Sequence, residues 1–146
     1  MHEVAPTYAY LLGLHNRHTG CVVVGSYSNQ WPCLFPQHGA GPKHLRPIEL
    51  ADWQVELTVR LHPDRLVRGL IHSDGWRGIN RVTGANGHGY DYTRYQFSNR
   101  SADIRRIFTD ACDALGVQWR KSNAWTVSVS RRPDVANLDR MVGPKR

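Results

Sequence analysis

Cysteine is scarce in this chain of 146 residues, in which only Cys21, Cys33 and Cys112 occur. An odd number of widely spaced cysteines does not make a disulfide framework, and the chain does not begin with a basic segment followed by an apolar run. These absences predict reduced thiols and a cytoplasmic location. No stretch approaches the roughly 20 apolar residues that a membrane-spanning helix needs, so no membrane is expected as a partner.

Acidic residues are also few, with 12 Asp and Glu against 19 Lys and Arg, which gives a net charge of +7 and a pI near 9.8. Such an excess of positive charge favours a polyanionic partner, and nucleic acid is the first candidate. A DNA-bound form would be associated with the nucleoid. The alternative is a basic soluble protein without such a partner. Apolar residues make up 40% of the chain, enough for the core of one ordinary domain.

A zinc site is a minor alternative for the histidines and cysteines. Cys33, His38 and His44 would supply ligands, together with Cys21. Their spacing, Cys-x4-His-x5-His, matches no compact zinc knuckle, and the sequence contains no C-x-x-C pair. No local motif indicates a Ser or Cys nucleophile either, so neither chemistry is the primary expectation.

Residues 31–47 hold four of the eight prolines and are expected to form a fixed, irregular linker. Residues 49–61 then return to helical spacing, with apolar side chains recurring at steps of three and four. The sequence therefore predicts a connecting helix with one apolar face. Its apolar positions are Leu50, Trp53, Leu57 and Leu61.

A second helix is expected over residues 65–74, where an apolar segment stops at Asp74 and Gly75. A helix that ends this way presents one carboxylate at its C-terminal tip. Gly69 falls in mid-helix, where glycine costs roughly 1 kcal/mol relative to alanine, so it indicates the close approach of another backbone. Two such helices, from two chains or two repeats, would place a metal ion between their acids.

Two β-hairpins are predicted after this helix. The first joins residues 76–82 to residues 90–98 through a glycine-rich turn that contains an Asn-Gly pair. The second joins residues 117–122 to residues 125–130. Alternation in residues 90–98 separates an apolar face from a polar, basic face.

A helix is predicted after each hairpin, the first capped by Ser101 and the second with Pro133 in its first turn. The order from residue 65 is therefore helix, strand, strand, helix, strand, strand, helix (αββαββα). This is an α+β fold in which helices cover one face of a four-stranded antiparallel sheet. The expected buried positions of the two helices are Ile104, Ile107, Phe108, Ala111, Leu115, Val135, Leu138 and Val142.

The nine residues Val67–Gly75, together with the order of elements after them, resemble the LAGLIDADG homing endonuclease family. His72 stands in place of the first acid of the family signature. Residues 31–39 and 98–105 look like a bacterial branch of homing-endonuclease-like proteins. Agreement with the signature is found at Gly69, Leu70, Ile71, Asp74 and Gly75.

A first copy of the motif looks truncated. The tract Leu11–Leu14 resembles its start, but the position that corresponds to Asp74 falls on His18, which is not an acid. Residues 21–28 look like a fourth strand and residues 49–61 like a last helix, with too little chain before them for a whole repeat.

The resemblance therefore implies three segments. Residues 1–47 would be a remnant of a first repeat with a Pro-rich linker. Residues 48–64 would be a connecting helix, and residues 65–146 a complete LAGLIDADG-like repeat. An internal deletion in the first repeat would explain this organisation.

The resemblance also implies catalytic roles. In the family, acids at the bases of two paired helices hold divalent metal ions over the scissile phosphates. Carried over, Asp74 would be the metal ligand, Mg²⁺ the expected ion, and the pair would help activate water. Asn99 stands where the family often has a polar residue that positions water. Arg132 stands where the family often has a lysine. A homodimer through the helix Arg65–Asp74 would supply the second acid.

The sheet of this family straddles the major groove of double-stranded DNA. Arginine and glutamine make bidentate contacts to guanine and adenine, so the polar face is the candidate base-reading surface. In the first strand, alternation places Arg77 and Arg81 on the same face as the apolar Ile79. A bulge in this strand would resolve the mixture. The candidate base-reading residues are Asn80, Arg94, Gln96 and Arg120. The candidate phosphate contacts, which are alternatively solvated, are Arg77, Arg81, Arg100 and Lys121.

Three functions stay open on the sequence alone. The first is a metal-dependent endonuclease that cuts or nicks double-stranded DNA. The second is a cleavage-inactive, sequence-specific DNA-binding protein with a regulatory role, which the missing first acid favours. The third is a decayed gene product with no function of its own.

Overall fold

The computed structural model describes residues 15–17, 21–23, 29–35, 37, 39, 41–85 and 87–144. The chain divides into two compact units, Met1–His38 and Gly39–Arg146. The described part of the first unit consists of strands β1 (His15–Arg17) and β2 (Cys21–Val23), which pair in antiparallel fashion, and the short helix α1 (Trp31–Leu34). None of the helices among the described residues is long and apolar enough to cross a membrane.

The first unit differs in part from the sequence expectation. His15–Arg17, for which no strand was predicted, is a strand paired with Cys21–Val23. Trp31–Leu34, expected to be irregular, is a helix, with its proline in the first turn where the missing N–H costs nothing. The tract Leu11–Leu14, the position His18 and residues 24–28 lie outside the described residues.

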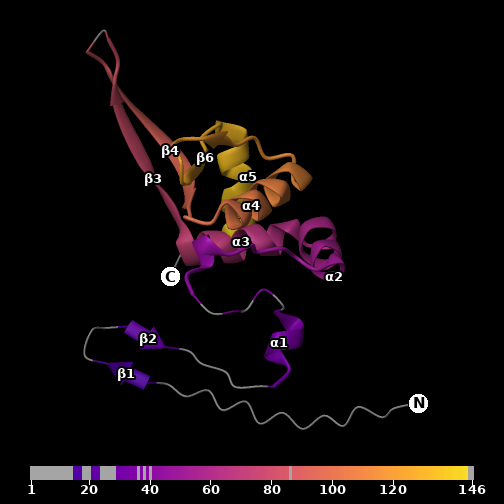
Figure 1. Cartoon of the computed structure of the whole chain (residues 1–146). Coiled ribbons are helices and arrows are strands. Elements are labelled where there is room, and N and C mark those ends of the chain that lie inside the picture. The colour runs from indigo at the N-terminus through magenta and orange to yellow at the C-terminus, as the bar shows by residue number, and fades with distance from the viewer. Residues whose placement is uncertain are drawn as a thin grey trace. The chain divides into compact units, whose positions relative to one another are not determined.

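The second unit contains the predicted order of elements (Figure 1). From α3 onward the order is helix, strand, strand, helix, strand, strand, helix, an α+β fold with an antiparallel sheet. Its elements are η1 (Lys43–Leu45), α2 (Asp52–Gln54), η2 (Val55–Leu61), α3 (Pro63–Asp74), β3 (Gly75–Thr83), β4 (Gly89–Ser98), α4 (Ala102–Ala114), β5 (Arg120–Lys121), β6 (Thr126–Val129) and α5 (Arg132–Val142).

The helix expected over residues 49–61 begins later and changes type. It starts at Asp52 as an α-helix and continues over Val55–Leu61 as a π-helix. The hydroxyl of Thr58 donates to the carbonyl oxygen of Gln54 at 2.6 Å, a local bond that competes with the regular helical ladder. The predicted apolar face remains largely at the surface, since Trp53, Leu57 and Leu61 are exposed.

The sheet order is β3-β4-β6-β5, with every neighbouring pair antiparallel. Strands β3 and β4 pair without interruption from Gly75 opposite Phe97 to Thr83 opposite Gly89. The pairing contains no bulge, so Arg77, Ile79 and Arg81 share one face. Charged and apolar side chains can share this face because the outer part of the hairpin extends beyond the helices (Figure 1). No buried core there requires the side chains of one face to be apolar.

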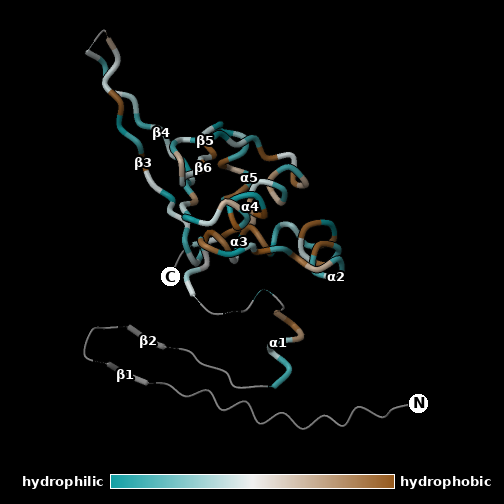
Figure 2. The backbone as a smooth tube through the Cα atoms, viewed as in Figure 1, coloured by the Kyte–Doolittle hydropathy of each residue, from teal (hydrophilic) through white to brown (hydrophobic). Residues whose placement is uncertain are grey.

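The core lies between the sheet and helices α3, α4 and α5, as predicted. The rings of Phe97 on β4 and Phe108 on α4 stack with their centroids 4.5 Å apart. Figure 2 shows hydrophobic colour gathered in the helices, whereas the projecting hairpin is mostly hydrophilic. The buried side chains are Val67, Ile71, Tyr95, Phe97, Phe108, Ala111, Cys112, Val117, Val127, Val129, Val135, Leu138 and Val142.

Strand β5 is shorter than the predicted segment 117–122. Gly116 adopts a positive φ of 66° after α4, and the N–H of Val117 donates to the carbonyl oxygen of Cys112 at 2.9 Å. Because the N–H of Val117 closes the end of α4 in this motif, it is not available for pairing in the sheet. Only Arg120 and Lys121 remain to pair with β6.

Two glycines of the motif have different surroundings. A Cβ atom added to Gly69 would meet nothing within 4 Å, so no backbone of the described chain approaches it. A Cβ atom added to Gly75 would lie 2.6 Å from Cα and 2.7 Å from the carbonyl oxygen of Ile71. The turn from α3 into β3 therefore needs glycine at position 75, whereas Gly69 faces open space.

Candidate functional site

Asp74 and Asn99, which the sequence singles out separately, lie side by side. Asp74 is the last residue of α3, and Asn99 follows the end of β4. The Asn99 side-chain amide donates from Nδ2 to Oδ2 of Asp74 at 3.0 Å. Its Oδ1 accepts the backbone N–H of Ser101 at 2.9 Å, which fixes the orientation of the amide. Asn99 therefore holds one oxygen of the carboxylate.

Arg105 supports this pair from helix α4. Its Nη1 donates to the main-chain carbonyl oxygens of Asn99 and Arg100. The hydroxyl of Ser101 caps the same helix by accepting the N–H of Ile104, as predicted. Sequence reasoning missed Arg105 because an arginine in a helix gives no signal of a partner that the loop before the helix provides.

Asp74 contributes one carboxylate at this position. Among the residues that the structure describes, no group of three His, Cys, Asp or Glu side chains is placed to hold a metal. His72, in the position of the first signature acid, instead contacts the carbonyl oxygen of Val142 through Nε2 at 3.0 Å. Because a carbonyl can only accept, that nitrogen carries the proton. Within the described residues, Asp74 is therefore not part of a group of three metal-ligating side chains.

Arg132, the third predicted catalytic residue, lies elsewhere in the described fold. It is the first residue of α5 and lines a shallow cavity of about 310 Å³ together with Arg77, Asp91 and Asp139. Asp74 is not among the residues that line this cavity. The geometry therefore connects Asp74 with Asn99 but provides no contact between Asp74 and Arg132.

The four predicted base-reading residues share the face of the sheet that is opposite the core. Arg94 and Gln96 alternate on β4 with the buried Tyr95 and Phe97. The register continues this face across the sheet, because Gln96 lies opposite Ser128, which in turn lies opposite Arg120. Asn80 belongs to the same face through its pairing with Tyr92. We call this surface the open face.

The open face offers hydrogen-bond donors without partners. Within the described part of the chain, no hydrogen bond or ion pair involves the side chains of Asn80, Arg94, Gln96 or Arg120. No Asp or Glu occurs at the strand positions of this face. The arrangement is therefore a donor-rich, positively charged surface that suits a polyanion.

The predicted phosphate contacts are placed differently. Arg81 and Lys121 have the opposite strand parity, and Arg81 lies 3.7 Å from the carboxylate of Asp91. Arg100 lies next to the Asp74–Asn99 pair along the chain, with its guanidinium 5.5 Å from the ring centroid of Trp125. Arg100 directly follows Asn99, whose side chain binds Asp74.

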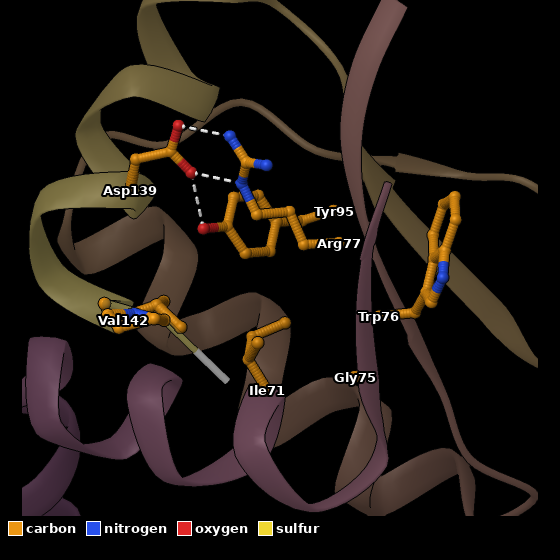
Figure 3. Close-up of a pocket in the computed structure, with 9 residues that line it drawn as sticks. Ile71, Gly75, Trp76, Arg77, Tyr95, Asp139 and Val142 are labelled. Carbon is orange, nitrogen blue, oxygen red and sulfur yellow. Dashed lines mark hydrogen bonds and ion pairs between the residues drawn. The ribbon is translucent and has the colours of Figure 1, made fainter. Parts of the chain in front are cut away.

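Arg77 belongs to a polar cluster that sequence reasoning did not foresee (Figure 3). Its Nε and Nη2 donate to the two carboxylate oxygens of Asp139 at 2.6 and 2.8 Å. The hydroxyl of Tyr95 donates to the same carboxylate at 2.6 Å. The cluster, here called the Asp139 clasp, fastens the base of the β3–β4 hairpin to helix α5. Arg77 is therefore committed to the fold rather than free for phosphate.

The electrostatics of the clasp follow from its contacts. The hydrogen bonds from Arg77 lower the pKa of Asp139 below its usual value. Burial, reinforced by the hydrogen bond to Asp139, raises the pKa of Tyr95 to about 12. The clasp thus keeps a charged carboxylate and a protonated phenol throughout the neutral range.

Replacing Asp139 with asparagine is expected to lower the free energy of unfolding at neutral pH by about 1 kcal/mol, a value discounted because both charged partners are partly exposed to solvent. The pKa of Asp139 is lowered in the fold, so its contribution is complete above the unfolded pKa of about 3.9 and is lost as the pH falls through the folded value. Urea unfolding across this acid range checks the prediction. A wild-type advantage that persists unchanged well below pH 3 would contradict it.

The zinc alternative gains no support from the described residues. Cys33 is an exposed free thiol, and Cys112 is buried in the core, where burial raises the pKa of its thiol to about 12. His38 lies outside the described residues.

A comparison with the models of known protein families and with curated proteins finds no match to this chain. The case for a function therefore depends on the arrangement of its own residues.

Proposed function

We propose that this chain is a DNA-binding protein of the LAGLIDADG homing-endonuclease type, whose sheet lies on double-stranded DNA through the open face. One observation carries the proposal. Asn80, Arg94, Gln96 and Arg120 share a face without acids, and none of their side chains has a partner within the described residues. Arginine and amide side chains in such an array match the hydrogen-bonding edges of bases in the major groove.

Binding of a labelled duplex over a range of salt concentrations tests this proposal. Phosphate contacts release counterions, so the logarithm of the affinity should fall linearly with the logarithm of the salt concentration. The absence of binding, or binding that is indifferent to salt, would contradict the proposal.

Cleavage of DNA is a second candidate function, favoured by the contact between Asp74 and Asn99. Mg²⁺ is typically held by one or two carboxylates together with substrate phosphates, and would act as a Lewis acid at the phosphodiester. Asp74 would provide one carboxylate, with Asn99 holding it in place. A second copy of the chain, packed through α3, would provide the other. Without that copy, a cleavage-inactive, regulatory DNA-binding protein is the alternative.

Incubation of the chain with supercoiled plasmid and Mg²⁺ distinguishes these candidates. If the chain is a nuclease, wild type should nick or cut the plasmid, and Asp74→Asn should lose at least about a hundredfold in rate while binding DNA equally well, because the variant removes a ligand and not a DNA contact. Equal binding by both proteins with no cut product would eliminate the nuclease and leave the binder.

Gly69→Ala tests whether α3 pairs with a second copy. In an isolated chain the variant should be more stable by about 0.5–1 kcal/mol, because alanine is the better helix former and its methyl group enters open space. In a close-packed α3 pair the same methyl group would separate the helices, so self-association should weaken. Thermal unfolding and sedimentation, with and without DNA, measure the two effects. Unchanged self-association would exclude Gly69 from the interface.

A further inference from the structure

The open face carries aromatic rings as well as donors, and Trp76 is the first of them. Trp76 and Gly78 are two positions apart on β3 and therefore share this face. A Cβ atom added to Gly78 would overlap Cζ2, Cη2 and Cε2 of Trp76. The indole thus lies over Gly78, and the residue is 48% exposed. Figure 3 shows Trp76 and Arg77 leaving β3 on opposite sides.

Two tyrosines continue the row toward the tip of the hairpin. Tyr92 lies opposite Asn80, and Tyr90 lies opposite Val82. Their rings are nearly parallel, with an interplanar angle of 23° and centroids 6.3 Å apart. Both residues are more than two-fifths exposed. Along the hairpin the open face therefore presents an indole, an arginine and two phenols in successive rows, each row about 7 Å from the next.

This combination suits unpaired bases. A base in a duplex stacks on its neighbours, whereas an unpaired base has free ring faces that stack on aromatic side chains in a sequence-tolerant way. The guanidinium of Arg94 has no hydrogen-bond partner among the described residues and suits the phosphate backbone. An apolar protein partner fits less well, because it would bury the donors of Asn80, Arg94 and Gln96 without hydrogen bonds.

We infer that the open face of the β3–β4 hairpin is a stacking surface for the unpaired bases of single-stranded DNA. The inference rests on the proposed function in taking DNA as the partner, and it deepens that function by naming the form of DNA that binds best. A strand that is unpaired, or a duplex with an unpaired segment, places its bases on Trp76, Tyr92 and Tyr90. The donors of the same face then hold its backbone.

Fluorescence anisotropy with three labelled DNA probes tests the inference. The probes are a single strand, the matching duplex, and the same duplex with an unpaired central segment. The single strand and the interrupted duplex should bind about tenfold more tightly than the full duplex. Trp76→Ala and Tyr92→Ala should each remove about tenfold of the affinity for the single strand, while affinity for the full duplex changes less than about twofold.

Two further variants separate stacking from folding. Tyr92→Phe keeps the ring and should retain the affinity of wild type for the single strand. Ile79→Ala removes an exposed apolar side chain from the other face of the same hairpin and should also bind normally. Far-ultraviolet circular dichroism and thermal unfolding confirm that each variant is folded.

The outcomes distinguish this inference from the proposed function. Preference for the full duplex, unaffected by Trp76→Ala and Tyr92→Ala, would overturn the inference and leave duplex binding in place. Binding to none of the probes would overturn both. Stronger binding to an RNA strand of the same sequence would overturn the assignment to DNA.

Discussion

Phe97→Ala is expected to lower the free energy of unfolding by about 3–5 kcal/mol, the range measured for large-to-small changes of a buried phenylalanine. Phe97 is completely buried and stacks on Phe108 at 4.5 Å between β4 and α4. Removing its ring leaves a cavity where the sheet meets the helices. Since small domains are stable by only about 5–15 kcal/mol, this loss would be a large part of the total.

Urea unfolding at neutral pH, followed by circular dichroism, measures this loss. Phe97→Leu is the matched control and should cost less than about 2 kcal/mol, because it keeps most of the apolar volume. Tyr92→Ala removes an exposed ring from the same strand and should cost still less. A loss below about 1 kcal/mol for Phe97→Ala would mean that the core does not depend on this stacked pair.

Arg94→Ala is expected to weaken DNA binding by about tenfold and to reduce the salt slope by about one, because the open face would lose a guanidinium that has no partner among the described residues. Arg81→Ala makes the same change of charge on the same hairpin. Arg81 has the opposite parity and lies 3.7 Å from Asp91, so its loss should change the affinity by less than about twofold.

Binding isotherms of the two variants at matched salt concentrations test whether the face or the total charge decides affinity. Equal losses for Arg94→Ala and Arg81→Ala would show that only net charge matters. A larger loss for Arg81→Ala would move the interface to the helix side of the hairpin. Either result would contradict binding through the open face.

Much of the fold was predictable because local patterns and the core agree from Arg94 on β4 to the end of α4. Tyr95 and Phe97 alternate with Arg94 and Gln96, and the structure buries the first pair while leaving the second pair outside the core. The cap of α4 by Ser101 was also predictable, because it involves residues that are close together in the sequence. Where a strand packs against helices, periodicity in the sequence reports the face of each side chain.

The same rule fails where no core is present. Ile79 is 56% exposed although it is apolar, because this part of the hairpin lies outside the buried core. Its place on the same face as Arg77 and Arg81 thus carried no information about burial, and no bulge separates the three residues. The π-helical form of Val55–Leu61 could not be predicted either, because a π-helix keeps much the same spacing of apolar residues as an α-helix.

The candidate site could be predicted as residues but not as geometry. Asp74 was identified from the motif and Asn99 from its place after the second strand, yet their hydrogen bond depends on the turn at Gly75 and on the end of β4. The Asp139 clasp joins Arg77 to a carboxylate 62 positions away. Pairings between distant side chains require the tertiary structure, because no local pattern encodes them.

The unbroken pairing of β3 with β4 has a consequence for protein engineering. Since no bulge resets the alternation, one residue added to each strand next to the turn would lengthen the ribbon and leave the rest of its pairing intact. A single residue inserted into one strand near its base would instead turn every outer side chain on that strand to the opposite side. The hairpin can therefore be lengthened without changing the helices and the rest of the sheet, provided that each addition places one residue in both strands.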